Sequence, residues 1–364
     1  MTKGQLVLET GEVFTGDWLG YESEVTGEVV FNTSMTGYQE IFTDPSYAGQ
    51  IITLTYPIVG NYGMNSINIE SDRLQIAGVI INDLCDKPSH FQAKTTLSEE
   101  LKQNRIPGLK NVDTRALVAV IRKRRTVKGR IVLEKAFPDY KYSFSIPNTK
   151  HLVQKVSVKQ PIQLGKGDCH IVVLDFGYKK SIVEGLLNHH CKVTIMPFSE
   201  KSASIQALNP DGIIISNGPG NPKELQLYFP VVKKLTENYP TLGICLGHQL
   251  IALAYGADTE KLPFGHRGSN HPVKDLLTGK VKITSQNHGY VVRKDSIDPT
   301  IFLPLFQHVN DGTIEGMKHH FLPITTVQFH PESHPGPSDT AYIMTEFMEQ
   351  VRHLGGITYA QSIK

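Results

Sequence analysis

Cys245 stands in a pattern of residues that suits a nucleophile. Residues 241–249 read TLGICLGHQ, with glycines at 243 and 247 on either side of the cysteine. The residues before Cys245 resemble a short buried strand and residues 250–255 an apolar helix, so the pattern predicts a sharp strand-to-helix turn with the thiol at its apex. A helix N-terminus favours the reactive thiolate. By itself, the same spacing is equally typical of a small, packed, unreactive thiol.

An imidazole and a carboxylate lie two residues apart at His330 and Glu332, in a segment from residue 325 that is predicted to be a short strand. Alternate residues of an extended strand face the same way, so both side chains are expected to point into one pocket. A cysteine nucleophile needs a base, and the base needs an acceptor that fixes its tautomer. Cys245, His330 and Glu332 therefore form a candidate triad.

A glycine-rich loop, Asn217-Gly-Pro-Gly220, follows another predicted strand. Such a loop can aim a backbone N–H inward, and together with the N–H of Leu246 it would form an oxyanion hole. A simple tight turn is the alternative interpretation. Phosphate binding is not favoured, because the spacing fits neither a Walker A loop nor GxGxxG.

Composition limits the classes of protein that fit this chain. The 364 residues favour two domains, and the net charge of 37 − 35 = +2 gives no support for binding nucleic acid or an anionic membrane. Four scattered cysteines without a disulfide framework suit a reducing compartment. The N-terminus has no apolar signal region and no later run is long enough to span a bilayer. We therefore expect a cytoplasmic, soluble protein. The scattered histidines lack zinc-site spacing, so no metal site is predicted.

The chain changes character near its middle. The first part, to about residue 82, is β-rich, with a hairpin at 5–14, and two helices follow, one capped by Thr96 with Glu99 and one by Asp113. From residue 170 apolar strands alternate with helices, which indicates a mostly parallel, flavodoxin-like α/β sheet whose ligand site lies at the carboxyl ends of its strands. The predicted elements are strands at 28–31, 50–55, 76–81, 170–175, 192–196 and 211–216 and helices at 181–189 and 223–237. We predict a β-rich α+β domain at 1–150, a linker at 151–168 and an α/β domain at 169–364.

The basic run Arg122–Arg125 invites a nucleic-acid interpretation. A solvated helix C-terminus, whose cations complement the helix dipole, is favoured instead. No aromatic residues are interleaved to stack on bases.

Three segments resemble the signatures of class I, triad-type glutamine amidotransferases: SNGPGNP, GICLGHQ and QFHPE, in that order. FGHRGSNHPVKD, TSQNHGY, TGYQEIFTDPSY, TLTYPIVGNYG and VDTRAL resemble more narrowly the small, glutamine-hydrolysing chain of carbamoyl-phosphate synthetase. The resemblance covers nearly the whole chain. Tyr290 departs from the expected Phe, and the run after VDTRAL is more basic than expected.

The resemblance implies that Cys245 is the nucleophile, His330 the general acid/base and Glu332 its orienting partner. It implies L-glutamine binding by Ser46, Gly218, Gly220, Leu246, Gln249, Asn287, Gly289 and Tyr290. Ammonia would pass to a separate large chain, in a heterodimer that could assemble further. The large chain would use ATP and Mg to make carbamoyl phosphate from bicarbonate for arginine or pyrimidine synthesis. No cofactor is expected in the present chain.

Two other classes of function stay open at this point. One is a free-standing cysteine γ-glutamyl hydrolase, which would not need the first domain. The other is a non-catalytic glutamine-sensing scaffold, against which the intact triad residues argue.

Overall fold

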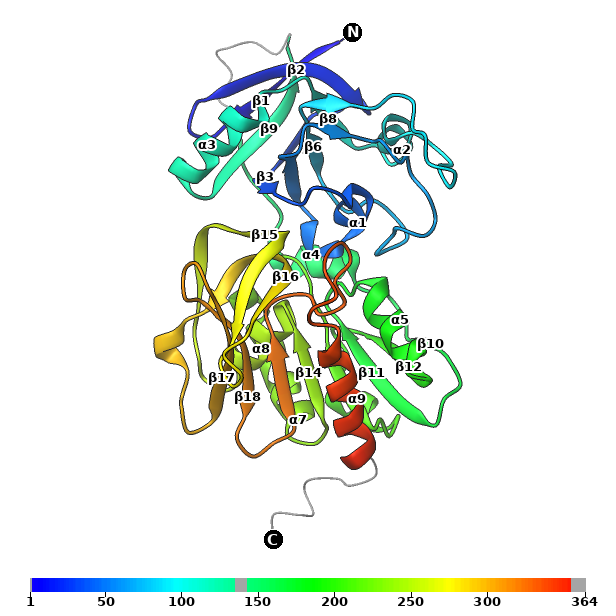
Figure 1. Ribbon diagram of the computed structural model, residues 1–364, viewed down its shortest axis with the longest axis vertical. Helices are drawn as coiled ribbons and strands as arrows, with labels where there is room; N and C mark the ends of the chain where they lie inside the picture. Colours follow the sequence, from blue (N-terminus) through cyan, green and yellow to red (C-terminus); the bar gives the residue numbers. More distant parts are fainter. Residues whose placement is uncertain (1, 135–142, 355–364) are drawn as a thin grey trace. The chain divides into compact units, whose positions relative to one another are not determined.

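The computed structural model describes residues 2–134 and 143–354 (Figure 1). The chain divides into two compact units, 1–147 and 148–364. Within the described residues no helix combines the length and apolar character needed to cross a bilayer.

The first unit is built on a closed barrel with the strand order β1-β2-β8-β6-β4-β3-β9. The predicted hairpin is confirmed, since β1 and β2 pair antiparallel around a turn at 9–12. The barrel closes because β9 pairs with both β1 and β3. Its strands are β1 (Lys3–Leu8), β2 (Val13–Gly20), β3 (Val25–Asn32), β4 (Gln50–Leu54), β6 (Gly78–Ile80), β8 (Pro107–Lys110) and β9 (Val127–Leu133), beside the separate pair β5 (Ile58–Val59) and β7 (Asp83–Leu84).

Both predicted helix caps of the first unit are present. Thr96 and Glu99 form a reciprocal capping box at the start of α2 (Leu97–Gln103), and Asp113 accepts from the Ala116 N–H at the start of α3 (Thr114–Arg124). Arg124 ends α3 in an ion pair with Glu12 at 2.9 Å, as expected for a basic helix terminus. The unit also contains α1 (Tyr38–Thr43) and the 3₁₀ turn η1 (Pro45–Tyr47).

The second unit is organised around a ten-stranded sheet of order β10-β12-β11-β13-β14-β19-β18-β16-β15-β17. The neighbouring strands β12, β11, β13, β14 and β19 run parallel, in the flavodoxin-like arrangement. The sheet continues beyond β19 with antiparallel pairing, which begins at β18. The strands are β10 (Ile162–Leu164), β11 (Cys169–Asp175), β12 (Cys191–Pro197), β13 (Gly212–Ile215), β14 (Thr241–Ile244), β15 (Thr259–Asp275), β16 (Val281–Val292), β17 (Phe302–His308), β18 (Ile314–His319) and β19 (Ile324–Val327).

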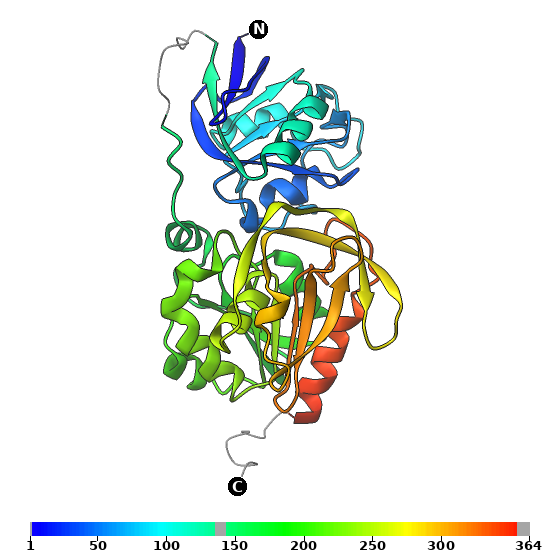
Figure 2. The same ribbon diagram turned by 90° about the vertical axis from the view of Figure 1, so that its left-hand side faces the viewer.

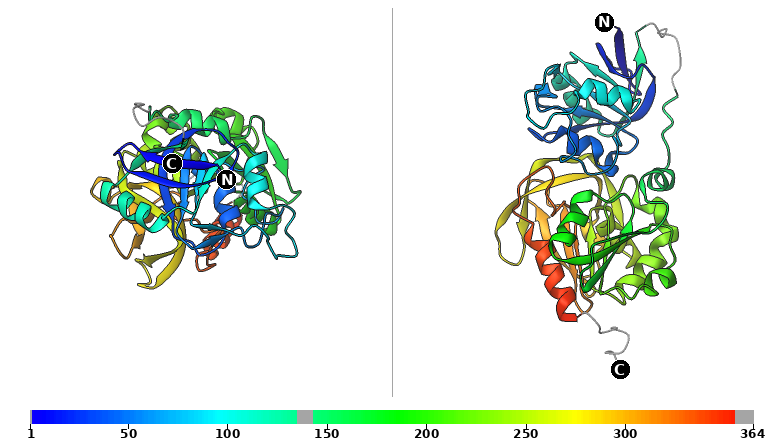
Figure 3. Two further views of the ribbon diagram at one scale, coloured as in Figure 1. Left: turned by 90° about the horizontal axis from the view of Figure 1, so that it is seen from above. Right: turned by 90° about the vertical axis from the view of Figure 1, so that its right-hand side faces the viewer.

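Both faces of the parallel strands are buried, which explains their continuous apolar sequences. In β11, Ile171 and Val173 join one core cluster with α5 (Lys180–Asn188) and α9 (Tyr342–Leu354). Val172 and Leu174 join another cluster with α7 (Phe229–Thr236) and α8 (Leu246–Ala254). Figure 3 shows α9 (red) lying against the sheet. Beyond the parallel strands, β15 and β16 are long and bent (Figure 2), with register shifts along their pairing.

Two expectations for this unit need amendment. The predicted helix at 223–237 is broken into the 3₁₀ segment η2 (Pro222–Tyr228) and α7, with a non-helical Leu225. Pro230 stands in the first turn of α7, where a missing N–H is tolerated, so it favours a new start over a continuous helix. The segment expected as a linker, 151–168, contains most of α4 (Thr149–Val156) and all of β10, which pairs with β12. The remaining helices are α6 (Ser202–Gln206) and the 3₁₀ turn η3 (Lys294–Ser296).

Candidate active site

Cys245 lies between β14 and α8, at the carboxyl end of a parallel strand. Its backbone has φ 53° and ψ −103°, a conformation that costs a non-glycine residue about 1–3 kcal/mol and persists only where the surroundings enforce it. A backbone hydrogen bond from the Cys245 N–H to the Val327 carbonyl, at 2.8 Å, holds the turn against β19. The predicted strand–turn–helix with Cys245 at its apex is thus present, and Cys245 is the N-cap residue of α8, although its thiol forms no capping hydrogen bond.

The flanking glycines are required by close packing of the turn. A Cβ on Gly247 would lie 2.0 Å from the carbonyl oxygen of Ile215 in the neighbouring strand. A Cβ on Gly243 would lie 2.6 Å from the Ile251 side chain and 3.1 Å from the backbone of Gly247. These distances leave no room for any side chain, so both glycines are needed to bring α8 against the sheet behind the cysteine.

His330 and Glu332 come together as the sequence predicts, although not on a strand. β19 ends at Val327, and His330 is held instead by an isolated bridge in which its N–H donates to the Ser285 carbonyl at 2.9 Å. The chain then turns, with Ser333 at φ 64°. His330 Nδ1 lies 2.6 Å from Glu332 Oε1, and both side chains are 3% exposed. This turn, and not the alternation of side chains along a strand, therefore brings His330 and Glu332 into contact.

Lys179, at the start of α5, completes this buried group and was not identified from the sequence. Its Nζ lies 3.0 Å from Glu332 Oε1 and donates to the His334 carbonyl at 2.6 Å. Burial acts to raise the pKa of Glu332, but Lys179 and His330 outweigh it and hold that pKa well below its ordinary value. No motif marks this lysine, since it lies 153 residues before its partner in the chain.

Burial also disfavours the charged form of His330. The Glu332 carboxylate and the Cys245 thiol nevertheless outweigh burial and raise the pKa of His330 to about 10. An imidazolium beside a thiol is the arrangement that favours a reactive thiolate.

Two further groups face the sulfur. Cys245 Sγ lies 3.6 Å from the Asn287 carbonyl, and the Gln328 Nε2 donates to Sγ at 3.7 Å. Gln249 orients this amide, because its Nε2 donates both to Gln328 Oε1 at 2.9 Å and to the Tyr290 carbonyl at 2.7 Å. Gln328, which stands two residues before His330, was not among the site residues predicted from the sequence.

The remaining predicted residues lie in three places. Gly218 and Gly220 follow β13, and Gly218 packs so closely that a Cβ there would lie 2.3 Å from the Phe176 carbonyl. Gly289 and Tyr290 continue β16 beyond Asn287. Ser46 belongs to the first unit, where it is 5% exposed and its N–H donates to Asp44. Its place in a glutamine site stays a prediction.

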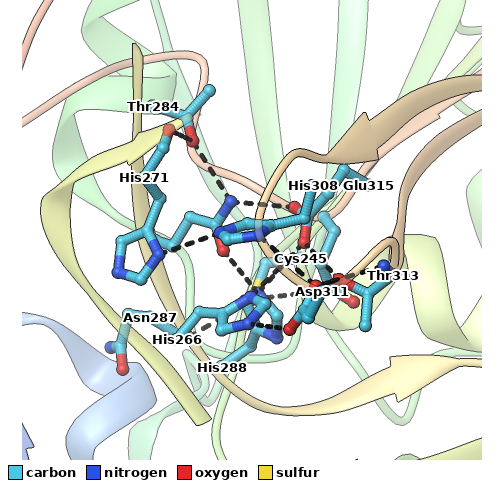
Figure 4. A network of polar contacts seen from close by, with 12 residues as sticks. Cys245, His266, His271, Thr284, Asn287, His288, His308, Asp311, Thr313 and Glu315 are labelled. Atoms are coloured by element: carbon cyan, nitrogen blue, oxygen red, sulfur yellow. Dashed lines mark hydrogen bonds and ion pairs between the residues drawn. The ribbon is translucent and has the colours of Figure 1, made fainter. Parts of the chain in front are cut away.

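A histidine cluster lies on the antiparallel strands near Cys245 (Figure 4). His266 Nε2 lies 2.7 Å from Asp311 Oδ2, its ring stacks on that of His308 at 4.2 Å, and His271 Nδ1 lies 3.2 Å from His308 Nε2. These three histidines offer ligand atoms within 4.8 Å of one another, as do His266, His288 and Glu315. The expectation that the histidines stay scattered is wrong, because strand pairing gathers residues that lie far apart in sequence.

The cluster is bonded in part internally and supports the strand beside Cys245, whereas His266 Nδ1 and His271 Nε2 are buried without a hydrogen bond among the described residues. The Asn310 N–H donates to His308 Nδ1 at 3.2 Å, and Asp311 Oδ1 lies 3.3 Å from the same nitrogen. Asp311 and Glu315 raise the pKa of His266 to about 9, against the effect of its burial. Glu315 also accepts from Gln286 Nε2 at 3.0 Å, next to Asn287. These contacts need no ion, and the absence of a metal from the site stays a prediction.

Family models match both units. Residues 6–131 match the carbamoyl-phosphate synthase small chain, CPSase domain, and residues 172–350 match glutamine amidotransferase class-I. The chain is 45% identical over 353 residues, 97% of this chain and 98% of the relative, to the carbamoyl phosphate synthase arginine-specific small chain of Halalkalibacterium halodurans. It is 46% identical over 349 residues to the arginine-specific small chain of Bacillus subtilis, which is 96% of this chain and 97% of the relative.

The pyrimidine-specific small chain of H. halodurans is nearly as similar, at 44% identity over 359 residues, 96% of this chain and 98% of the relative. Identity therefore does not separate the arginine-specific from the pyrimidine-specific role. The two family models fall on the β-barrel unit and on the unit that contains Cys245. The chain belongs to the carbamoyl-phosphate synthase small-chain family.

Proposed function

We propose that this chain hydrolyses L-glutamine to glutamate and ammonia and passes the ammonia to a carbamoyl-phosphate synthetase large chain. The observation that carries the proposal is the buried contact of His330 with Glu332 beside a cysteine held at a strained strand-to-helix turn. The two-unit match to small chains supports the partner, since a free-standing γ-glutamyl hydrolase would not need the barrel unit. ATP, Mg and bicarbonate would be used by the large chain, in a cytoplasmic heterodimer.

The reaction begins with attack of the Cys245 sulfur on the side-chain carboxamide carbon of glutamine. His330 holds a proton at neutral pH, because its pKa is raised to about 10, and it therefore stabilises the thiolate before attack. The same proton is transferred to the departing ammonia, which leaves a γ-glutamyl thioester. His330, now neutral, takes a proton from the water that hydrolyses the thioester. Acid–base assistance of this kind contributes about 10²–10⁴-fold.

The backbone N–H of Leu246 and those of the loop at Gly218 and Gly220 would hold the oxyanion. Leu246 is the first residue of α8 and directly follows Cys245, so its N–H has no partner within the helix. Removing one such donor typically costs about 3–4 kcal/mol of transition-state stabilisation. Backbone donors are rigid here, because both loops are packed against neighbouring strands.

Gln249 and the β16 strand would bind the amino-acid end of glutamine. Both hydrogens of the Gln249 amide are used by Gln328 and Tyr290, so its Oε1 atom is the one suited to accept from the substrate ammonium. Asn287 and Gly289 would complete this part of the site.

The test is the Cys245→Ser variant in complex with the large chain. Glutamine-dependent synthesis of carbamoyl phosphate should be lost, whereas synthesis from added ammonia should persist. Glutamine-driven turnover in the variant would overturn the assignment of the nucleophile. Trapping labelled glutamine on wild-type protein by acid quench should show one thioester, absent from the variant. Failure of wild-type protein to bind a large chain would instead favour the free-standing hydrolase.

A further inference from the structure

Two cysteines outside the active site begin neighbouring parallel strands. Cys169 is the first residue of β11 and Cys191 the first of β12, and the two are direct register partners. Paired strands lie about 4.8 Å apart. This spacing falls within the roughly 4.4–6.8 Å between Cα atoms that a disulfide requires.

The two thiols also face the same side of the sheet. Cys191 is part of the core cluster formed with α5 and α9, and Cys169 packs against that cluster from its partly buried position. Cys191 Sγ lies 3.7 Å from Met348 Sδ of α9 and interacts with the His189 carbonyl. Cys169 is therefore more accessible than Cys191, and both thiols lie on the face of the sheet that α5 and α9 cover.

Each thiol of the pair affects the pKa of the other. The interaction with Cys169 lowers the pKa of Cys191, with a further lowering by Arg352, although burial opposes it. The same interaction, together with burial, raises the pKa of Cys169.

We propose that Cys169 and Cys191 form a reversible redox pair that closes to an intramolecular disulfide on reaction with a hydroperoxide. One thiol of the pair loses its proton and attacks one peroxide oxygen, so that an S–O bond forms and the O–O bond breaks; sulfenic acid remains, and the departing hydroxide takes up that proton to become water. The sulfur of the second thiol then attacks the sulfenic sulfur, and its proton goes to the departing hydroxide. The S–S bond forms and water leaves, so two thiols lose two electrons and the peroxide becomes two waters.

The pair is separate from the nucleophile. Cys169 and Cys191 lie at the amino ends of their strands, whereas Cys245 follows the carboxyl end of a strand parallel to them. The seven residues of β11 span roughly 20 Å between those two edges of the sheet. Oxidation of the pair is therefore a different event from oxidation of Cys245.

The experiment uses the full chain carrying Cys245→Ser, so that three of the four cysteines remain. Folded protein is treated with a small excess of hydrogen peroxide, catalase is added, and thiols are counted by alkylation after unfolding. The count should fall from three to one, peptide mapping should show Cys169 joined to Cys191, and dithiothreitol should restore all three thiols. A count that stays at three overturns the proposal.

Matched variants identify the bond. Added to the same background, Cys85→Ser should leave the joined peptides intact, because that cysteine belongs to the other unit. Cys169→Ser should remove them. A loss of thiols that dithiothreitol does not reverse, or a linkage that includes Cys85, would contradict the pair. With Cys245 intact, Cys169→Ser should retain wild-type glutaminase activity.

Discussion

Replacing Lys179 with methionine tests whether the buried charge group at the triad depends on its lysine. The Nζ atom lies 3.0 Å from Glu332 Oε1, and both side chains are 3% exposed. Breaking a buried ion pair by removing one partner costs about 3–5 kcal/mol, because the other charge is left in a medium that solvates it poorly. His330 still faces the carboxylate at 2.6 Å, so we expect the lower end, about 3 kcal/mol.

The neighbouring residue provides a matched control. Lys180 pairs with Glu184 at the same 3.0 Å, but these side chains are 44% and 53% exposed. Exposed pairs of this spacing on a helix contribute about 0.3–0.5 kcal/mol. Urea unfolding followed by circular dichroism at pH 7 should therefore show a large loss of stability for Lys179→Met and almost none for Lys180→Met.

The pH dependence gives a second readout. The folded-state pKa of Glu332 is lowered, so its contribution to stability is present above the ordinary value of 4.5 and is lost as the pH falls through the folded pKa. Lys179 is a main cause of that lowering. The gap in unfolding free energy between wild type and Lys179→Met should accordingly stay nearly constant from pH 7 to about pH 5 and narrow as the pH falls below 4.5. A gap below 1 kcal/mol at pH 7, or one that widens on acidification, would refute this account.

Three further outcomes follow from the site. Gly247→Ala should destabilise the chain and abolish glutaminase activity, because its Cβ would overlap a backbone carbonyl. Gly185→Ala is the control: its Cβ would have no neighbouring atom closer than 3.9 Å, so this variant should be tolerated in the same assays. Gln328→Met should slow alkylation of Cys245 by iodoacetamide at neutral pH up to about tenfold, since it removes an N–H that stabilises the thiolate; an unchanged rate would show that this donor is unimportant. Glu332→Gln should move the alkaline limb of the pH–rate profile to lower pH, because the carboxylate raises the pKa of the triad imidazole; a limb that stays in place would contradict that role.

Short-range patterns predicted much of the fold. Apolar runs located the parallel strands, and capping residues located α2 and α3, because each of these signals depends on neighbours within one or two turns. The closed barrel was not predictable in the same way. Its closure depends on β9 pairing with β1 across more than one hundred residues, and no local pattern specifies that partner. The break before α7 could have been read from Pro230, whose position in the first helical turn indicates a new helix start.

The site residues differ in the same way: some could be predicted from short motifs, and others depend on contacts between distant segments. Cys245, His330 and Glu332 stand in short motifs whose spacing expresses their chemistry, and the structure brings them together. Lys179 acts only through a contact between distant segments, and its own sequence context is that of a helix start. The histidine cluster is a similar case, since pairing of β15 with β16 and β17 assembles it.

The strained cysteine and the buried charges are best understood together. A turn at φ 53° and a group of charged side chains that are 3% exposed both cost free energy. The fold compensates by fixing each from outside the site: Gly243 and Gly247 allow close contact with the sheet, and Lys179 reaches Glu332 from the start of α5. Because these supports are rigid, the sulfur, the imidazole and the backbone donors need little rearrangement when charge develops in the reaction. Substitutions at the supports should therefore lower stability and glutamine hydrolysis together.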